Sequence, residues 1–116
     1  MNALLIMFAA QAILPSGLPD GVQMALRQHE ACFNGWGEMI NLSDSNAELL
    51  ASYRSKCAET RLTAFLRLRD LEPASGDQEV RSTEARNLLE GLELDWVMAI
   101  RSHAEKVVVD GRKVRR

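Results

Sequence analysis

The chain is poor in aromatic residues and lacks the motifs of the common enzyme classes. Its 116 residues include only two tryptophans, one tyrosine and three phenylalanines. Leucine, alanine, methionine and valine must therefore fill most of the interior, and this mixture favours helices. No H-E-x-x-H, G-x-S-x-G, P-loop or G-x-G-x-x-G pattern occurs, which argues against the enzymes that depend on them. We expect no catalytic residues and no enzyme activity.

Internal repeats, low-complexity tracts and strand-like alternation are also absent. The composition, 47% hydrophobic and 26% charged, is typical of one small globular domain. The apolar run at residues 3–9 ends before Gln11 and Pro15, well short of the ~20 residues that a membrane span needs. The sequence therefore predicts a single all-α domain over residues 20–110, with no stable membrane span.

Residues 1–12 combine this apolar run with Ala10-Gln11-Ala12, which resembles a signal-peptidase site. We predict cleavage after Ala12 and a periplasmic or secreted mature protein. No lysine or arginine precedes the run, so two alternatives stay open: an apolar helix retained on the domain, and a cytoplasmic protein. Residues 13–19, which contain Pro15 and Pro19, are predicted to be a linker.

Three helices are predicted, arranged as an up-down-up bundle. The first has Asp20 as its N-cap and carries an apolar stripe from Val22 to Ile40, interrupted by Gly35 and Gly37.

The second predicted helix begins at the capping box Ser45–Glu48 and runs to Leu71. The third begins after Ser75 or Asp77 and frays at residues 107–109, before Gly111. Residues 111–116 form a basic tail without aromatic residues that could stack on bases, so we expect no nucleic-acid binding.

The two cysteines, Cys32 and Cys57, lie about twelve residues on either side of the centre of the polar turn at residues 42–46. In an antiparallel hairpin of two helices they would lie at the same height, as a disulfide requires. We predict a disulfide across the first hairpin, provided that Gly35 and Gly37 do not end the first helix early. Free thiols and metal ligation remain the alternatives.

A metal site would use His29, Cys32 and Cys57, because His29 and Cys32 are three residues apart on a helix that Cys57 would face. Haem binding would need Met24 or Met39 together with His103. The metal site lacks a fourth ligand, and no C-x-x-C-H motif exists for haem attachment. We expect no cofactor, and we interpret both histidines as core or near-core residues.

Charge is unevenly distributed around the second bend. Residues 52–69 carry five basic residues and one acidic residue, whereas residues 70–95 carry eight acidic residues and two arginines. We expect these neighbouring segments to pair with each other. The carboxylates of the third helix are expected to lie mostly on a solvated face: Glu84, Glu90, Glu93 and Asp95.

The second predicted helix is apolar nearly all round in its later half. Leu62 and Leu66 lie opposite Cys57, with Phe65 between them and the core stripe. Either another element or a partner must cover this surface. We predict a protein partner or a homo-oligomer contact that uses these three residues with the neighbouring Arg61 and Arg69. The metal- or haem-binding module is the alternative function.

Overall fold

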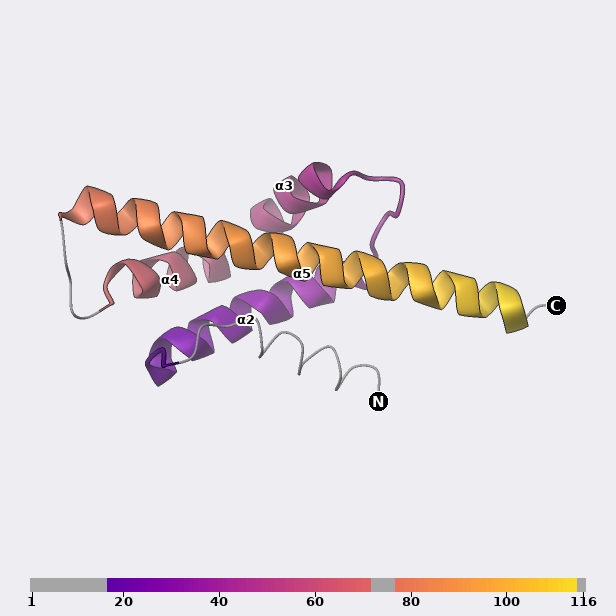
Figure 1. The fold of residues 1–116 in the computed structure, drawn as a ribbon, viewed down its shortest axis with the longest axis horizontal. Coiled ribbons are helices and arrows are strands. Elements are labelled where there is room, and N and C mark those ends of the chain that lie inside the picture. Colours follow the sequence, from indigo (N-terminus) through magenta and orange to yellow (C-terminus); the bar gives the residue numbers. More distant parts are fainter. Residues whose placement is uncertain (1–16, 72–76, 115–116) are drawn as a thin grey trace.

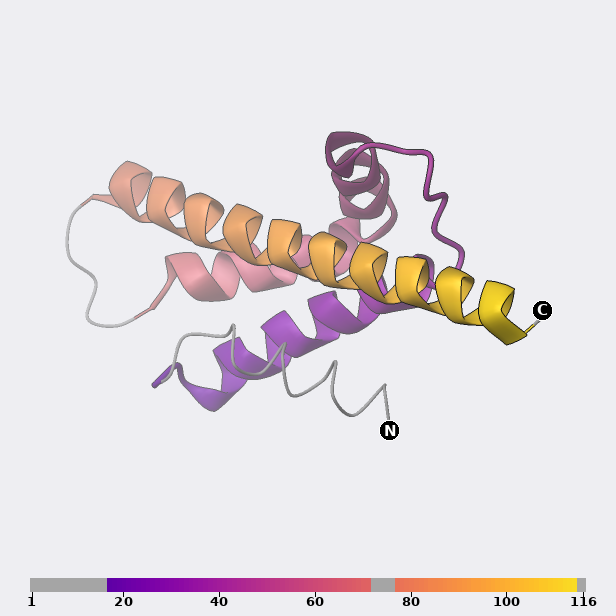
Figure 2. The same cartoon turned by 45° about the vertical axis from the view of Figure 1, so that its right-hand side comes forward.

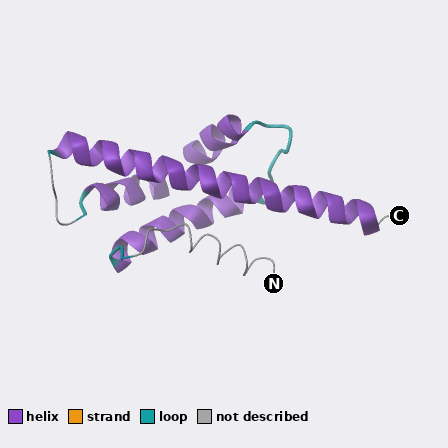
Figure 3. Ribbon diagram, viewed as in Figure 1, coloured by secondary structure: helices purple, strands orange, loops and turns teal. Residues whose placement is uncertain are grey.

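A computed structural model of the protein describes residues 17–71 and 77–114, and these residues form helices and no strands (Figure 1, Figure 3). The helices are α2 (Asp20–Gly37), α3 (Asn46–Lys56), α4 (Ala58–Arg69) and α5 (Gln78–Val114). The predicted all-α class is thus confirmed for this part of the chain. The predicted signal peptide, its cleavage site, the alternative N-terminal helix and most of the linker lie outside the described residues.

The predicted start signals of two helices are confirmed. Ser45 Oγ accepts a hydrogen bond from the backbone N–H of Glu48, and the Glu48 carboxylate accepts one from the backbone N–H of Ser45, completing the capping box. Asp77 caps α5 by accepting a backbone N–H bond at 2.9 Å. By contrast, α2 begins at Asp20 itself, with Pro19 at the N-cap and no side-chain cap.

The three-helix up-down-up arrangement is not confirmed, because the second predicted helix is two helices that meet at Cys57. The backbone of Cys57 has φ −107° and ψ 30°, which interrupts the α-helix. The helices α2 and α5 run in one direction and α4 in the other (Figure 1). Figure 2 shows α3 tilted out of line with α4. This bend lets α3 pack on α5 while α4 packs on both α2 and α5.

The side chain of Arg101 on α5 fixes the start of α3. Its Nε donates to Asn46 Oδ1 at 2.9 Å and its Nη1 donates to the Leu42 carbonyl at 3.2 Å. The remaining terminal nitrogen donates to the Asp44 carbonyl. One guanidinium group thus holds the turn that leads from α2 into α3.

The long helix α5 supplies much of the core. Its 37 residues span about 55 Å at 1.5 Å per residue. Its buried apolar residues form one stripe, which comprises Ala85, Leu89, Leu92, Trp96, Val97 and Ile100. The stripe ends there, because α5 extends beyond the end of α2 (Figure 1) and Val107 is 53% exposed.

Aromatic rings fill the centre of the bundle. Phe33 of α2 makes edge-on contacts with Tyr53 and Trp96, with ring centroids 5.7 and 5.6 Å apart. The His29 ring contacts Phe33 and Trp96 in the same way, at 4.9 and 5.5 Å. The prediction that His29 is a core residue is confirmed, because the side chain is fully buried.

Gly35 and Gly37 of α2 differ in their surroundings, although neither interrupts the helix before its end at Gly37. A Cβ atom at Gly37 would lie 2.7 Å from Ile100 Cγ2, whereas one at Gly35 would meet nothing within 4 Å. Gly37 therefore permits the close approach of α2 to α5, and Gly35 has no such role.

Gly37→Ala is expected to lower the free energy of unfolding by about 1–3 kcal/mol, because the new methyl group overpacks against Ile100, whose branched side chain has few rotamers. Gly35→Ala is the matched control and should raise stability by about 0.5–1 kcal/mol through helix propensity. Urea unfolding of the two variants beside the parent measures both values. Equal stability of the two variants would show that Ile100 repacks without cost.

Candidate functional site

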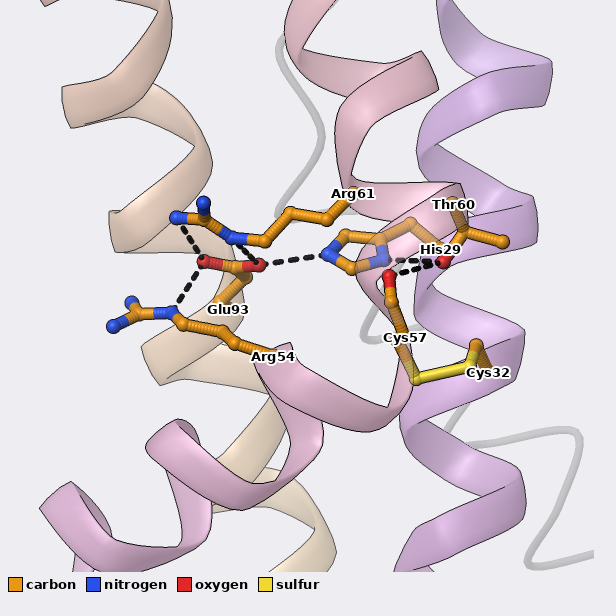
Figure 4. Close-up of polar contacts among 7 residues, drawn as sticks. All are labelled: His29, Cys32, Arg54, Cys57, Thr60, Arg61 and Glu93. Carbon is orange, nitrogen blue, oxygen red and sulfur yellow. Dashed lines mark hydrogen bonds and ion pairs between the residues drawn. A yellow bond between two sulfur atoms is a disulfide. The ribbon is translucent and has the colours of Figure 1, made fainter.

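The predicted disulfide between Cys32 and Cys57 is present, with a Cα–Cα distance of 6.0 Å. Its setting differs from the expected straight hairpin. The main packing partners of α2 are α4 and α5 rather than α3. Cys57 lies at the bend between α3 and α4, so the disulfide fastens the C-terminal half of α2 to this bend (Figure 4).

The expectation that the Glu93 carboxylate lies on a solvated face is wrong. The Glu93 side chain of α5 is fully buried. It accepts four hydrogen bonds (Figure 4): from His29 Nε2 at 2.7 Å, from Arg54 Nε at 2.8 Å, and from Arg61 Nε and Nη2 at 2.8 and 3.2 Å. Two carboxylate oxygens offer about four lone-pair positions. All the acceptor capacity of Glu93 is therefore used.

These bonds keep Glu93 ionised. Burial alone would raise its pKa, but hydrogen bonds from His29, Arg61 and Arg54 outweigh burial and hold the pKa below its usual value of 4.5.

The carboxyl group of Glu30 on α2 shows the opposite case. Burial raises the pKa of Glu30 to about 7, and the opposing effect of the Arg27 charge is smaller. Ionising Glu30 therefore costs stability as the pH rises from 4.5 toward 7.

The buried network contains a hydroxyl, an imidazole and a carboxylate in contact, as a hydrolase triad does. They belong to Thr60, His29 and Glu93. Thr60 Oγ1 lies 2.8 Å from His29 Nδ1 and donates a hydrogen bond to the Cys57 carbonyl at 3.0 Å. His29 is fully buried, and neither Thr60 nor His29 lines any of the larger grooves among the described residues. The geometry thus supports a structural role, in which the network ties α2, α4 and α5 together.

The side chains of the alternative metal site are engaged elsewhere. Cys32 and Cys57 are bonded to each other, and both ring nitrogens of His29 have hydrogen-bond partners. Within residues 17–71 and 77–114, no group of three or more His, Cys, Asp or Glu side chains is placed to hold a metal ion.

The predicted pairing of the basic and acidic segments is confirmed at three arginines. Arg54 and Arg61 pair with Glu93, and Arg69 pairs with Asp70 at 3.0 Å. The Glu93 pairs are partly buried, whereas Asp70 is exposed. The exposed pair contributes little to stability, because water screens it.

The structure brings the predicted partner-binding residues together along one groove of about 580 Å³. Leu62, Phe65 and Leu66 of α4 line it, and Leu62 and Leu66 are 60% and 37% exposed. The predicted Arg61 and Arg69 also line it. The predicted set did not include the other lining residues: Arg54, Ser55, Ala58, Arg86 and Leu89. Arg86 and Leu89 belong to α5 and reach the groove only in the folded bundle, whereas Ala58 lies one turn before Leu62 on α4.

Comparisons with known proteins give no match: no protein-family model, no curated protein and no solved structure is detectably similar to the chain. In the part of the chain that the structure describes, no helix is both long and apolar enough to cross a membrane.

Proposed function

We propose that this is an exported, non-enzymatic helical protein that binds a protein partner through the groove along α4. The observation that carries the proposal is the exposure of Leu62. This residue lines the groove, and 60% of its surface is exposed. Leu66 and Phe65 extend the same apolar surface. Grouped apolar side chains on the surface of a small domain are typical of protein interaction sites.

The charges around the groove define the kind of partner. Among the described residues, its lining contains four arginines, Arg54, Arg61, Arg69 and Arg86, and no carboxylate. A complementary partner presents apolar side chains flanked by acidic residues. An amphipathic helix with an acidic edge satisfies both requirements, and such a helix docks through residues spaced three and four apart.

The disulfide supports export, because disulfides persist mainly in oxidising compartments such as the periplasm or the extracellular space. The apolar run and Ala10-Gln11-Ala12 at the N-terminus point the same way. The non-enzymatic assignment is supported by the missing motifs and by the burial of His29.

The double substitution Leu62→Glu with Leu66→Glu tests the proposal. We expect it to abolish partner binding or self-association and to shift the melting temperature by only a few degrees, because exposed leucines contribute little to stability. Met98→Glu is the matched control, since Met98 on α5 is 51% exposed and does not line this groove. Sedimentation velocity, and binding to a partner purified after cross-linking, compare the three proteins.

A large fall in melting temperature of the double variant would contradict the proposal, since it would mean that the chain itself covers these leucines. Unchanged association and unchanged stability would also contradict it, because the groove would then have no interaction role.

A further inference from the structure

Two guanidinium groups share one buried carboxylate beside the groove. Arg54 comes from α3 and Arg61 from α4, and both bond to Glu93 of α5. One negative charge thus faces two positive charges, even before any charge on His29 is counted. The partly buried site keeps an excess positive charge that is screened less than a charge in water.

The arginines also keep unused donors. Arg54 bonds to Glu93 through Nε alone, so neither of its terminal nitrogens has a hydrogen-bond partner among the described residues. Arg61 uses Nε and Nη2, which leaves Nη1 without a partner there. Both side chains are 29% exposed and line the groove. Figure 4 shows both guanidinium groups on the side of Glu93 away from His29.

The other two arginines of the groove are less suited to anion recognition. Arg69 directs Nε and Nη2 to Asp70, at 3.0 and 3.5 Å, which neutralises its charge. Arg86 is exposed and has no ion pair within the described residues, but nothing there anchors it. Only Arg54 and Arg61 combine an anchored end with free terminal nitrogens.

We propose that the free nitrogens of Arg54 and Arg61 bind a carboxylate of the protein partner, an inference that rests on the proposed function. The planar fork of Arg54, whose two terminal nitrogens are free, matches a carboxylate geometrically, and Arg61 Nη1 supplies a further donor. Glu93 holds both guanidinium groups in place before binding, so less side-chain entropy is lost in the complex. Leu62, Phe65 and Leu66 bind the apolar side chains beside that carboxylate. The ligand is therefore a peptide segment in which an aspartate or glutamate flanks an apolar face.

Two synthetic amphipathic peptides test the inference with the intact protein. They share one leucine face and differ only in having glutamate or glutamine along one edge, and both are titrated at low salt by NMR and calorimetry. We expect the glutamate peptide to bind on the order of tenfold more tightly, which corresponds to about 1.4 kcal/mol. Added salt should reduce this difference.

Arg54→Gln should remove most of the preference for the glutamate peptide. Arg54 is the better site for substitution, because it makes one bond to Glu93 where Arg61 makes two. Arg67→Gln is the matched control, since Arg67 is an exposed arginine of α4 that does not line the groove. If Arg54→Gln does not fold, the guanidinium resonances of the parent report the same contact, and they should shift only with the glutamate peptide.

Equal binding of both peptides would overturn the carboxylate site and leave the proposed function standing. If neither peptide binds, the carboxylate site is also overturned. The proposed function is then tested separately by the double variant Leu62→Glu with Leu66→Glu. Sodium octanoate is the third probe. If octanoate binds and neither peptide does, the inference is overturned, and the ligand of the groove is a small anionic amphiphile instead of a peptide segment.

Discussion

Glu93→Gln is expected to lower the free energy of unfolding by about 3–5 kcal/mol, the typical cost of removing one partner from a buried ion pair. The amide would leave Arg54 and Arg61 without a counter-charge, and its own N–H groups would face the donors of these arginines. Small domains are stable by only about 5–15 kcal/mol in total. This one change therefore removes a large part of the stability.

Glu90→Gln is the control for this prediction, since Glu90 lies one turn earlier on α5 and has no ion pair within the described residues. We expect it to stay within about 0.5 kcal/mol of the parent. Urea unfolding followed by circular dichroism compares the three proteins. A loss below about 1 kcal/mol for Glu93→Gln would show that water satisfies the two arginines equally well.

The effect of Glu93→Gln should depend on pH in a defined direction. The folded-state pKa of Glu93 is lowered from 4.5, so its stabilisation is complete above this value and is lost as the pH falls through the folded-state pKa. The gap between parent and variant should therefore be constant near neutral pH and shrink in acid. A gap that widened in acid would contradict the assignment of an ionised Glu93.

Removing the disulfide through Cys32→Ala with Cys57→Ala is expected to lower the free energy of unfolding by about 3.5 kcal/mol. The two cysteines are 25 residues apart, and cross-linking a loop of this size reduces the entropy of the unfolded chain by that amount. The helices should form as before at low temperature. Cys57 belongs to the buried core, but the edge-on contacts of Phe33 with Tyr53 and Trp96 do not pass through the sulfur atoms. Thermal unfolding measures the loss.

The reduced parent should resemble the double alanine variant in stability, and a reductant should leave the variant unchanged. Non-reducing peptide mapping of protein from an oxidising compartment gives an independent check. Recovery of both cysteines as alkylated free thiols would contradict the disulfide.

The sequence alone determined the features that depend on near neighbours or on simple spacing. The capping box at Ser45 and the cap at Asp77 involve bonds across three residues, so local chemistry is enough to identify them. The pairing of Cys32 with Cys57 followed from their nearly equal spacing on the two sides of one turn. The exposed Leu62 was indicated because a helix that is apolar all round leaves some of its side chains without a place in a small core.

Only the tertiary structure decided the bend at Cys57 and the burial of Glu93. No glycine or proline lies near Cys57, so the helix break there reflects the packing of α3 and α4 on different neighbours. The partners of Glu93 are 32, 39 and 64 residues away in the sequence. A buried carboxylate is stable only when such partners surround it, and helix periodicity carries no information about side chains that meet across three other helices.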